Sequence, residues 1–262
     1  MGRYVDTVGS RGVSAPARAM ASGGSGWLAE AWALLLKDLR AELRTKVALS
    51  TVGLFTFSSL LLLSLATATL KEKLALDPLT NQMRPAWDAA GKMGLLWLLL
   101  CFAAFSGLSH AFVHEEETGT VMALRLSMSA GAVYAGKLAF NLLILFAVAL
   151  VVTPVFMLIT GMPLGAPIVF LIVMVSGCVG LAGAATIVGA LAAKARGSGA
   201  LYPAIGLPLL VVFLLLLLNA ANTTFIVHPP ALRLVRDIGG LLSYGILLIT
   251  VSALTFSFVW ED

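Results

Sequence analysis

Charged residues are scarce in this chain. Asp, Glu, Lys and Arg make up only 11% of its 262 residues, whereas a soluble domain carries about a quarter. Hydrophobic residues make up 60%, and the mean hydropathy is +0.99. This composition excludes a soluble globular domain, and no nucleic-acid partner is expected. The sequence predicts an all-α integral membrane protein.

Cysteine and histidine are also few. Cys101 and Cys178 both lie inside apolar runs, so they indicate small buried packing residues rather than a disulfide framework. His110 and His228 could each ligate a metal or heme iron, but neither has a second ligand at a useful spacing. No paired catalytic groups, carboxylate relay or selectivity-filter motif is present. We therefore predict a chain that is not an enzyme and binds no cofactor of its own, and we assign neither histidine a role.

Long apolar segments dominate what remains. A bilayer core requires about 20 apolar residues per helix. The longest uncharged run, 138–193, has 56 residues and must fold back, with Gly161-Met-Pro-Leu-Gly165 as the turn. The sequence then predicts six transmembrane helices, at about 47–70, 93–113, 138–160, 166–193, 200–221 and 238–260.

Cations are distributed unequally between the two sides of these spans. Six spans place both termini on the same side of the membrane. With that side in the cytoplasm, eleven of the 17 Lys and Arg residues are cytoplasmic and six are outside. Because cytoplasmic segments carry an excess of cations, we predict that both termini are cytoplasmic.

The residues before the first span divide into two parts. Residues 1–26 are rich in Gly, Ala and Ser, with spaced arginines and no apolar core, which is typical of a disordered basic tail. Residues 27–46 predict an amphipathic helix in the cytoplasmic interface, and the alternative is a cytosolic extension of the first span. The remaining chain, 27–262, is predicted to form one six-span membrane domain. The apolar stripe of the interfacial helix comprises Trp27, Leu28, Ala31, Trp32, Leu35, Leu39 and Leu43.

The connection between the second and third spans has a pattern of its own. Three carboxylates, 115–117, lead into Thr118-Gly-Thr120, which can cap a helix, and negative charge suits a helix N-terminus. Apolar residues then recur at i, i+3 and i+7, the spacing of one helical face. We predict a short cytoplasmic coupling helix, which at two to three turns needs a partner surface to pack on. The predicted docking residues are Glu115, Glu116, Glu117, Gly119, Val121, Leu124, Arg125 and Met128.

A phosphate-binding pattern follows this connection. Gly131–Lys137 matches G-x-x-x-x-G-K, but Leu138 stands where a nucleotide site needs Ser or Thr for Mg²⁺, and no strand is predicted before it. We therefore interpret Lys137 as the cytoplasmic end of the third span, with its side chain extending to the membrane interface. A membrane domain with such a docking helix is predicted to bind a cytosolic partner.

Small residues recur in the fourth span. Ser176, Gly180 and Ala184 are four residues apart, a spacing that lets helix backbones approach closely in lipid. We predict helix packing at this face, against another helix of the chain or a second copy of it. A substrate groove would need more polar groups than Ser176 and Thr186 supply.

Several short segments, taken in order, resemble one family. They are Lys37-Asp-Leu-Arg-Ala-Glu-Leu-Arg44, Gly94-Leu-Leu-Trp97, Glu116-Glu-Thr-Gly-Thr120, Ala135-Gly-Lys137, Ala195-Arg-Gly197 and Leu207-Pro208. From about residue 30 to its end, the sequence resembles the heme exporter protein B family, the permease of the cytochrome c maturation system. The tail 1–26 and the long first outer loop depart from that family.

This resemblance implies an ABC-2-type permease in the bacterial cytoplasmic (inner) membrane. Its implied partners are an ABC ATPase subunit, a tryptophan-rich heme-handling membrane protein and a small single-span protein. The complex uses ATP hydrolysis to release a heme-loaded periplasmic chaperone, so heme is the suspected cargo of the complex and not a cofactor of this chain. Two alternatives remain open: an ABC-2 exporter of a lipid, polysaccharide or drug, and a membrane scaffold without transport activity.

Overall fold

The computed structural model describes residues 26–74, 90–117, 126–162, 164–194, 201–226 and 228–261. Within these ranges the chain forms seven long helices and no strand, which confirms the all-α prediction for the described residues. The predicted basic tail lies almost wholly outside them. The helices are α1 (Gly26–Thr45), α2 (Val47–Leu74), α3 (Ala90–Glu117), α5 (Ala130–Thr160), α6 (Pro167–Lys194), α7 (Leu201–Thr223) and α8 (Ala231–Glu261).

Each predicted span falls, within a residue, inside one of the helices α2, α3 and α5–α8. Three helical segments in the described ranges are long and apolar enough to cross a membrane, namely Ala130–Thr160, Pro167–Thr186 and Ala231–Ser257. Helices α1 and α2, which meet at 66°, make a fourth if they count as one bent span. The described parts of α3 and α7 contribute shorter apolar helices, Gly91–Phe105 and Leu210–Thr223. The count of six crossings stays a prediction.

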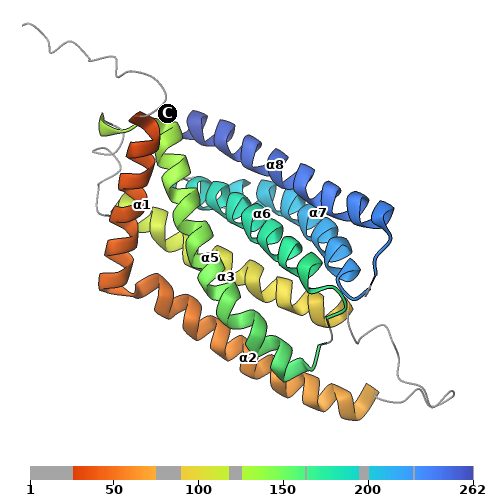
Figure 1. Cartoon of the computed structure of the whole chain (residues 1–262). Coiled ribbons are helices and arrows are strands. Elements are labelled where there is room, and N and C mark those ends of the chain that lie inside the picture. Colours follow the sequence, from red (N-terminus) through yellow and green to blue (C-terminus); the bar gives the residue numbers. More distant parts are fainter. Residues whose placement is uncertain are drawn as a thin grey trace, which may run out of the picture.

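Helix α6 is central in the bundle (Figure 1). It contacts α3, α5, α7 and α8, while α2 packs on the outside against α3 and α5. Helix α1 packs mainly along α5, at the end of the bundle where α5 begins and where α8 approaches the C-terminus (Figure 1). Two ends of the bundle can therefore be distinguished, one carrying α1 and the other carrying the turns between α5 and α6 and between α7 and α8.

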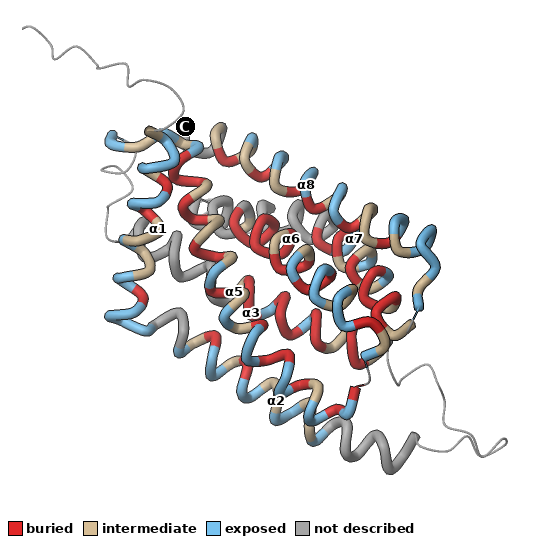
Figure 2. The backbone as a smooth tube through the Cα atoms, in the orientation of Figure 1, coloured by how far each residue is buried: buried red, intermediate tan, exposed pale blue. Residues whose placement is uncertain are grey.

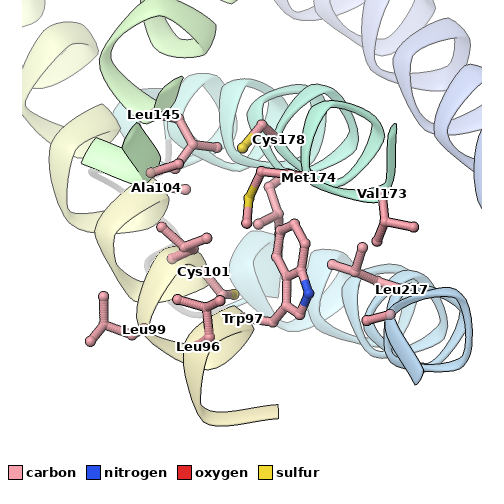
Figure 3. Close-up of a cluster of buried hydrophobic side chains, with 14 of the residues drawn as sticks. Leu96, Trp97, Leu99, Cys101, Ala104, Leu145, Val173, Met174, Cys178 and Leu217 are labelled. Carbon is pink, nitrogen blue, oxygen red and sulfur yellow. The ribbon is translucent and has the colours of Figure 1, made fainter. Parts of the chain in front are cut away.

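The core lies where α3, α6 and α7 meet, and the outward faces of α1, α2 and α8 are largely exposed (Figure 2). Figure 3 shows the Trp97 indole of α3 among Met174 of α6 and Leu217 of α7. Both cysteines, Cys101 and Cys178, are buried here as free thiols. Exposed leucines and phenylalanines on the outside are the surface that a bilayer would cover.

Helix α5 begins earlier than the predicted third span. Ser129 caps it in an extended conformation, with its Oγ accepting a hydrogen bond from the Ala132 amide at 3.3 Å, so the helix starts at Ala130 rather than near 138. The helix ends at Thr160, where Gly161 adopts a left-handed conformation (φ 61°) that glycine takes without steric cost. The predicted turn at 161–165 thus separates α5 from α6.

Candidate coupling site

The first two turns of α5 contain the phosphate-binding pattern of the sequence. Residues Gly131–Lys137 are helical throughout, whereas a phosphate-binding loop must present its backbone N–H groups in a non-helical turn. Gly136 has a different role here. A Cβ at this position would lie 2.9 Å from the Ala31 carbonyl oxygen and about 3 Å from Leu34, so glycine lets α1 approach the α5 backbone.

Apolar contacts hold α1 and α5 together around this glycine. Leu34 of α1 is almost fully buried in a small cluster with Val133 and Tyr134 of α5 and Phe256 of α8. The rings of Tyr134 and Phe256 are 5.6 Å apart and tilted. Near the N-terminus of α5, the Ser129 amide and hydroxyl each donate to the Glu30 carboxylate at 3.4 Å. The α1–α5 corner, meaning α1 with residues 128–141, is therefore packed around Gly136 and hydrogen-bonded near the N-terminus of α5.

An ion pair is buried in the α1–α5 corner. The Lys137 ammonium lies 2.9 Å from the Asp38 carboxylate, with the two side chains 2% and 10% exposed. The prediction that Lys137 extends to the membrane interface is therefore wrong. Because α1 covers this face of α5, the ammonium is enclosed by protein and is stabilised by the carboxylate instead of by water. In the sequence, Asp38 belongs to the polar side of the predicted interfacial helix and to a family segment, and neither pattern pairs it with Lys137.

Polar side chains continue along the same face of α5. One turn beyond Lys137, Asn141 donates from Nδ2 to the Thr186 hydroxyl of α6 at 2.8 Å, and both side chains are buried. One turn before it, the Tyr134 hydroxyl donates to the Ile249 carbonyl of α8 at 3.3 Å. Tyr134, Lys137 and Asn141 thus connect α5 to α8, α1 and α6 respectively. In the sequence, the only sign of these contacts is an asparagine four residues after a lysine inside an apolar run, and no prediction was based on it.

Most of the predicted coupling helix lies outside the described residues. Gly119, Val121, Leu124 and Arg125 all fall there, so the docking role remains a prediction. Met128 is described, half-buried, and packs against the cluster formed by Leu34, Val133, Tyr134 and Phe256. The described end of the connection therefore rests on the α1–α5 corner.

The carboxylates of the connection continue α3. Glu115, Glu116 and Glu117 form its last turn, which extends beyond the predicted span end at Val113. Residues 118–125 lie outside the described part of the chain, so the helix that the carboxylates are predicted to lead into stays a prediction. Glutamate favours helix, so the apolar helix continues through them, and negative charge at a helix C-terminus gains nothing from the macrodipole.

The small residues of α6 face neighbouring helices. A Cβ at Gly180 would overlap the Phe213 ring of α7, and one at Gly177 would overlap the Trp97 indole of α3. Ala184 is buried, and the partly buried Ser176 hydroxyl donates to the Ile172 carbonyl of its own helix at 2.8 Å. Large aromatic rings therefore pack directly on the α6 backbone, and contact with a second copy at this face stays a prediction.

No metal-binding cluster of three or more His, Cys, Asp or Glu residues occurs within the described residues. His228 is exposed in the turn before α8. His110 belongs to α3, and its side chain is outside the described part of the chain. The contacts of the α1–α5 corner connect α5 to α1, α6 and α8.

Comparison with known proteins identifies the architecture. A family model described as "ABC-2 type transporter" matches residues 30–215. The match begins in α1 and ends in α7, so it includes all of the α1–α5 corner except the first four residues of α1. No curated protein and no solved structure matches the chain.

Proposed function

Because the chain belongs to the ABC-2 type transporter family, we propose that it is the membrane permease subunit of an ATP-driven complex for heme export and cytochrome c maturation. The chain is a multi-pass membrane protein and a subunit of a transporter, and such permeases typically work with an ABC ATPase. In the proposal, the ATPase is a separate subunit. Its ATP hydrolysis drives release of a heme-loaded periplasmic chaperone.

The observation that carries an energy-coupling role is the α1–α5 corner. Asp38 and Lys137 fix α1 to the start of α5, and Met128 joins the adjacent connection to the same cluster. From there Asn141 connects to α6 and Tyr134 to α8. A displacement of the connection by a partner can thus pass into three helices of the bundle through short, directional contacts.

The proposed docking surface is the segment from Glu115 to Met128. Its acidic residues would meet basic residues of the ATPase, and the face made by Val121, Leu124 and Met128 would provide the apolar part of the contact. The proposal includes six transmembrane spans, cytoplasmic termini and the bacterial inner membrane. It places α1 at the cytoplasmic interface, with its exposed tryptophans, Trp27 and Trp32, toward lipid.

The heme assignment rests on the sequence resemblance and on its ordered motifs. It adds three expected partners: a tryptophan-rich heme-handling membrane protein, a small single-span protein and a second copy of this chain. The other candidate is an ABC-2 exporter of a lipid, polysaccharide or drug. The apolar core favours neither cargo, and the proposal leaves heme binding to the partners.

Deletion of the gene tests the cargo assignment. In a strain without a second maturation system, deletion should abolish covalent c-type cytochromes while b-type cytochromes persist, because only the former need heme attachment. Heme should stay on the periplasmic chaperone. A strain with an ATPase-dead partner should show the same phenotype, and plasmid-borne protein should restore c-type cytochromes. Normal c-type cytochromes in the deletion strain would reject the heme assignment in favour of the general exporter.

A further inference from the structure

The end of the bundle opposite α1 carries a second buried carboxylate. The backbone amides of Gly165 and Ala166 donate to the Thr224 carbonyl at 3.1 and 2.9 Å, which ties the α5–α6 turn to the α7–α8 turn. The Thr223 hydroxyl then donates to the Asp237 carboxylate of α8 at 2.8 Å. In Figure 1 this end of α8 lies far from the C-terminus. Asp237, in the second turn of α8, is thus hydrogen-bonded to the end of α7.

Two arginines are held on this carboxylate. Arg236 donates from Nε to Asp237 Oδ1 at 2.9 Å, and the Nε of Arg233 lies 3.5 Å from Oδ2. The Asp237 side chain is only 7% exposed, whereas those of Arg233 and Arg236 are 44% and 74% exposed. Two guanidinium groups against one carboxylate leave the cluster with a net charge of +1. The buried Asp237 carboxylate therefore holds two exposed, positively charged guanidinium groups.

The arginines adjoin an apolar surface. Leu232 and Val235, on the same turns of α8, are 83% and 71% exposed. At about 100° per residue, Arg236 faces the same direction as Leu254, five turns away, which is roughly 27 Å along the helix. Exposed Leu247, Val251 and Leu254 lie within about 60° of this direction and continue the face along α8. The arginine pair therefore lies at one end of the α8 face that a bilayer would cover, near the depth of a headgroup.

We propose that Arg233 and Arg236 bind the phosphate of an anionic phospholipid, whose acyl chains lie along the exposed apolar face of α8. Guanidinium groups match phosphate oxygens in bidentate geometry, and a headgroup of net charge −1 balances the +1 cluster. Zwitterionic headgroups add an ammonium that the arginines disfavour. A soluble phosphate ion or an acidic protein would pair with the two arginines but would leave the adjoining apolar surface without a partner.

Lipid titration of the purified full chain tests this site. The protein in neutral detergent is titrated with phosphatidylglycerol or phosphatidylcholine, and native mass spectrometry measures the dissociation constant of the tightest lipid. We expect phosphatidylglycerol to be preferred. Replacing Arg236 with Gln should weaken its binding about fivefold, and the double variant R233Q/R236Q about 30-fold. Arg236→Gln changes a side chain that is largely exposed, so the fold should be retained.

Two controls identify the source of the signal. R40Q/R44Q removes two exposed cations from α1, at the other end of the bundle, and should leave the tightest lipid site unchanged. Inorganic phosphate at millimolar concentration should not displace the lipid. Equal retention of both lipids by the unmodified chain, or a tight site insensitive to R233Q/R236Q, would overturn the proposal. Displacement by inorganic phosphate would show a site for a free anion and overturn it as well.

Discussion

A lysine inside a membrane domain needs a partner, because an unpaired buried ammonium costs several kcal/mol. The partner of Lys137 is Asp38, which lies in α1, much earlier in the sequence. Close approach of the two helices depends on Gly136, since any larger side chain would meet the Ala31 carbonyl. Burial of this pair thus requires the glycine and the carboxylate together.

Single substitutions in the pair should destabilise the protein, and the double substitution should largely restore it. Lys137→Met or Asp38→Leu removes one charge of a pair whose atoms lie 2.9 Å apart in the corner, which should cost several kcal/mol, about 3–5 at most because the Asp38 carboxylate also has the exposed Lys37 ammonium at 3.6 Å. D38L/K137M replaces both charges with apolar side chains and should recover most of that loss. Thermal unfolding in detergent measures the cycle, with the exposed-residue variant Arg44→Gln as control. Additive effects of the two substitutions would contradict a buried pair.

At the scale of the element, α1 presents two different faces. The buried face comprises Ala31, Leu34 and Glu42, with Asp38 nearly buried beside them, and it packs along α5. The stripe predicted from the sequence lies mostly beside that face, and its Trp27, Leu28, Trp32 and Leu43 are exposed. The residues that fasten α1 to the bundle are therefore largely distinct from those that would enter the interface.

The coupling helix should depend on one apolar face. Leu124→Asp places a charge on that face, and burying it unpaired at a packed interface should cost several kcal/mol. The ATPase partner should then no longer co-purify, while the permease still inserts because its spans are untouched. Leu126→Asp is the matched control, since Leu126 is 83% exposed and lies on the other side of the predicted helix. A complex that survives Leu124→Asp would show that this helix is not the interface.

At the scale of the whole molecule, the distribution of Lys and Arg between the two sides of the predicted spans indicates which end of the bundle faces the cytoplasm. The α1 end of the bundle carries the acidic turn of α3 and the start of α5, and the opposite end carries the turn around Thr224 and the first turns of α8 with Asp237. With six crossings both termini lie on one side, and the two crossings before the connection at 118–125 place it on that side as well. In the proposed function that side is the cytoplasm.

Reporter fusions should give one consistent topology. Fusions after residues 20, 125, 196 and 262 should report the cytoplasm, and fusions after residues 80 and 225 should report the outside, as the positive-inside rule requires. Alkaline phosphatase and green fluorescent protein provide complementary readouts for each position. An outside signal at residue 125 would rule out docking of a cytosolic ATPase there and would invalidate the proposed coupling route.

The sequence by itself determined the all-α membrane class and the approximate extent of the helices. Apolar runs long enough to cross a bilayer must satisfy their backbone groups internally, so composition and length are sufficient for that inference. The turn at Gly161 was readable for a similar local reason, because glycine and proline interrupt a helix. The predicted ends of the helices were less accurate. Helix α5 begins earlier because Ser129 caps it, and α3 continues through the glutamates 115–117 because glutamate favours helix.

Only the tertiary structure decided which polar residues meet. Asp38 with Lys137, Asn141 with Thr186, and Thr223 with Asp237 each join different helices. Helical periodicity places a residue on a face of its own helix but does not say which face of another helix will cover it. Periodicity therefore predicts Lys137 at the membrane interface and does not identify Asn141 as a contact to another helix. Burial selects such pairs, because a polar group enclosed by the bundle is stable only with a partner.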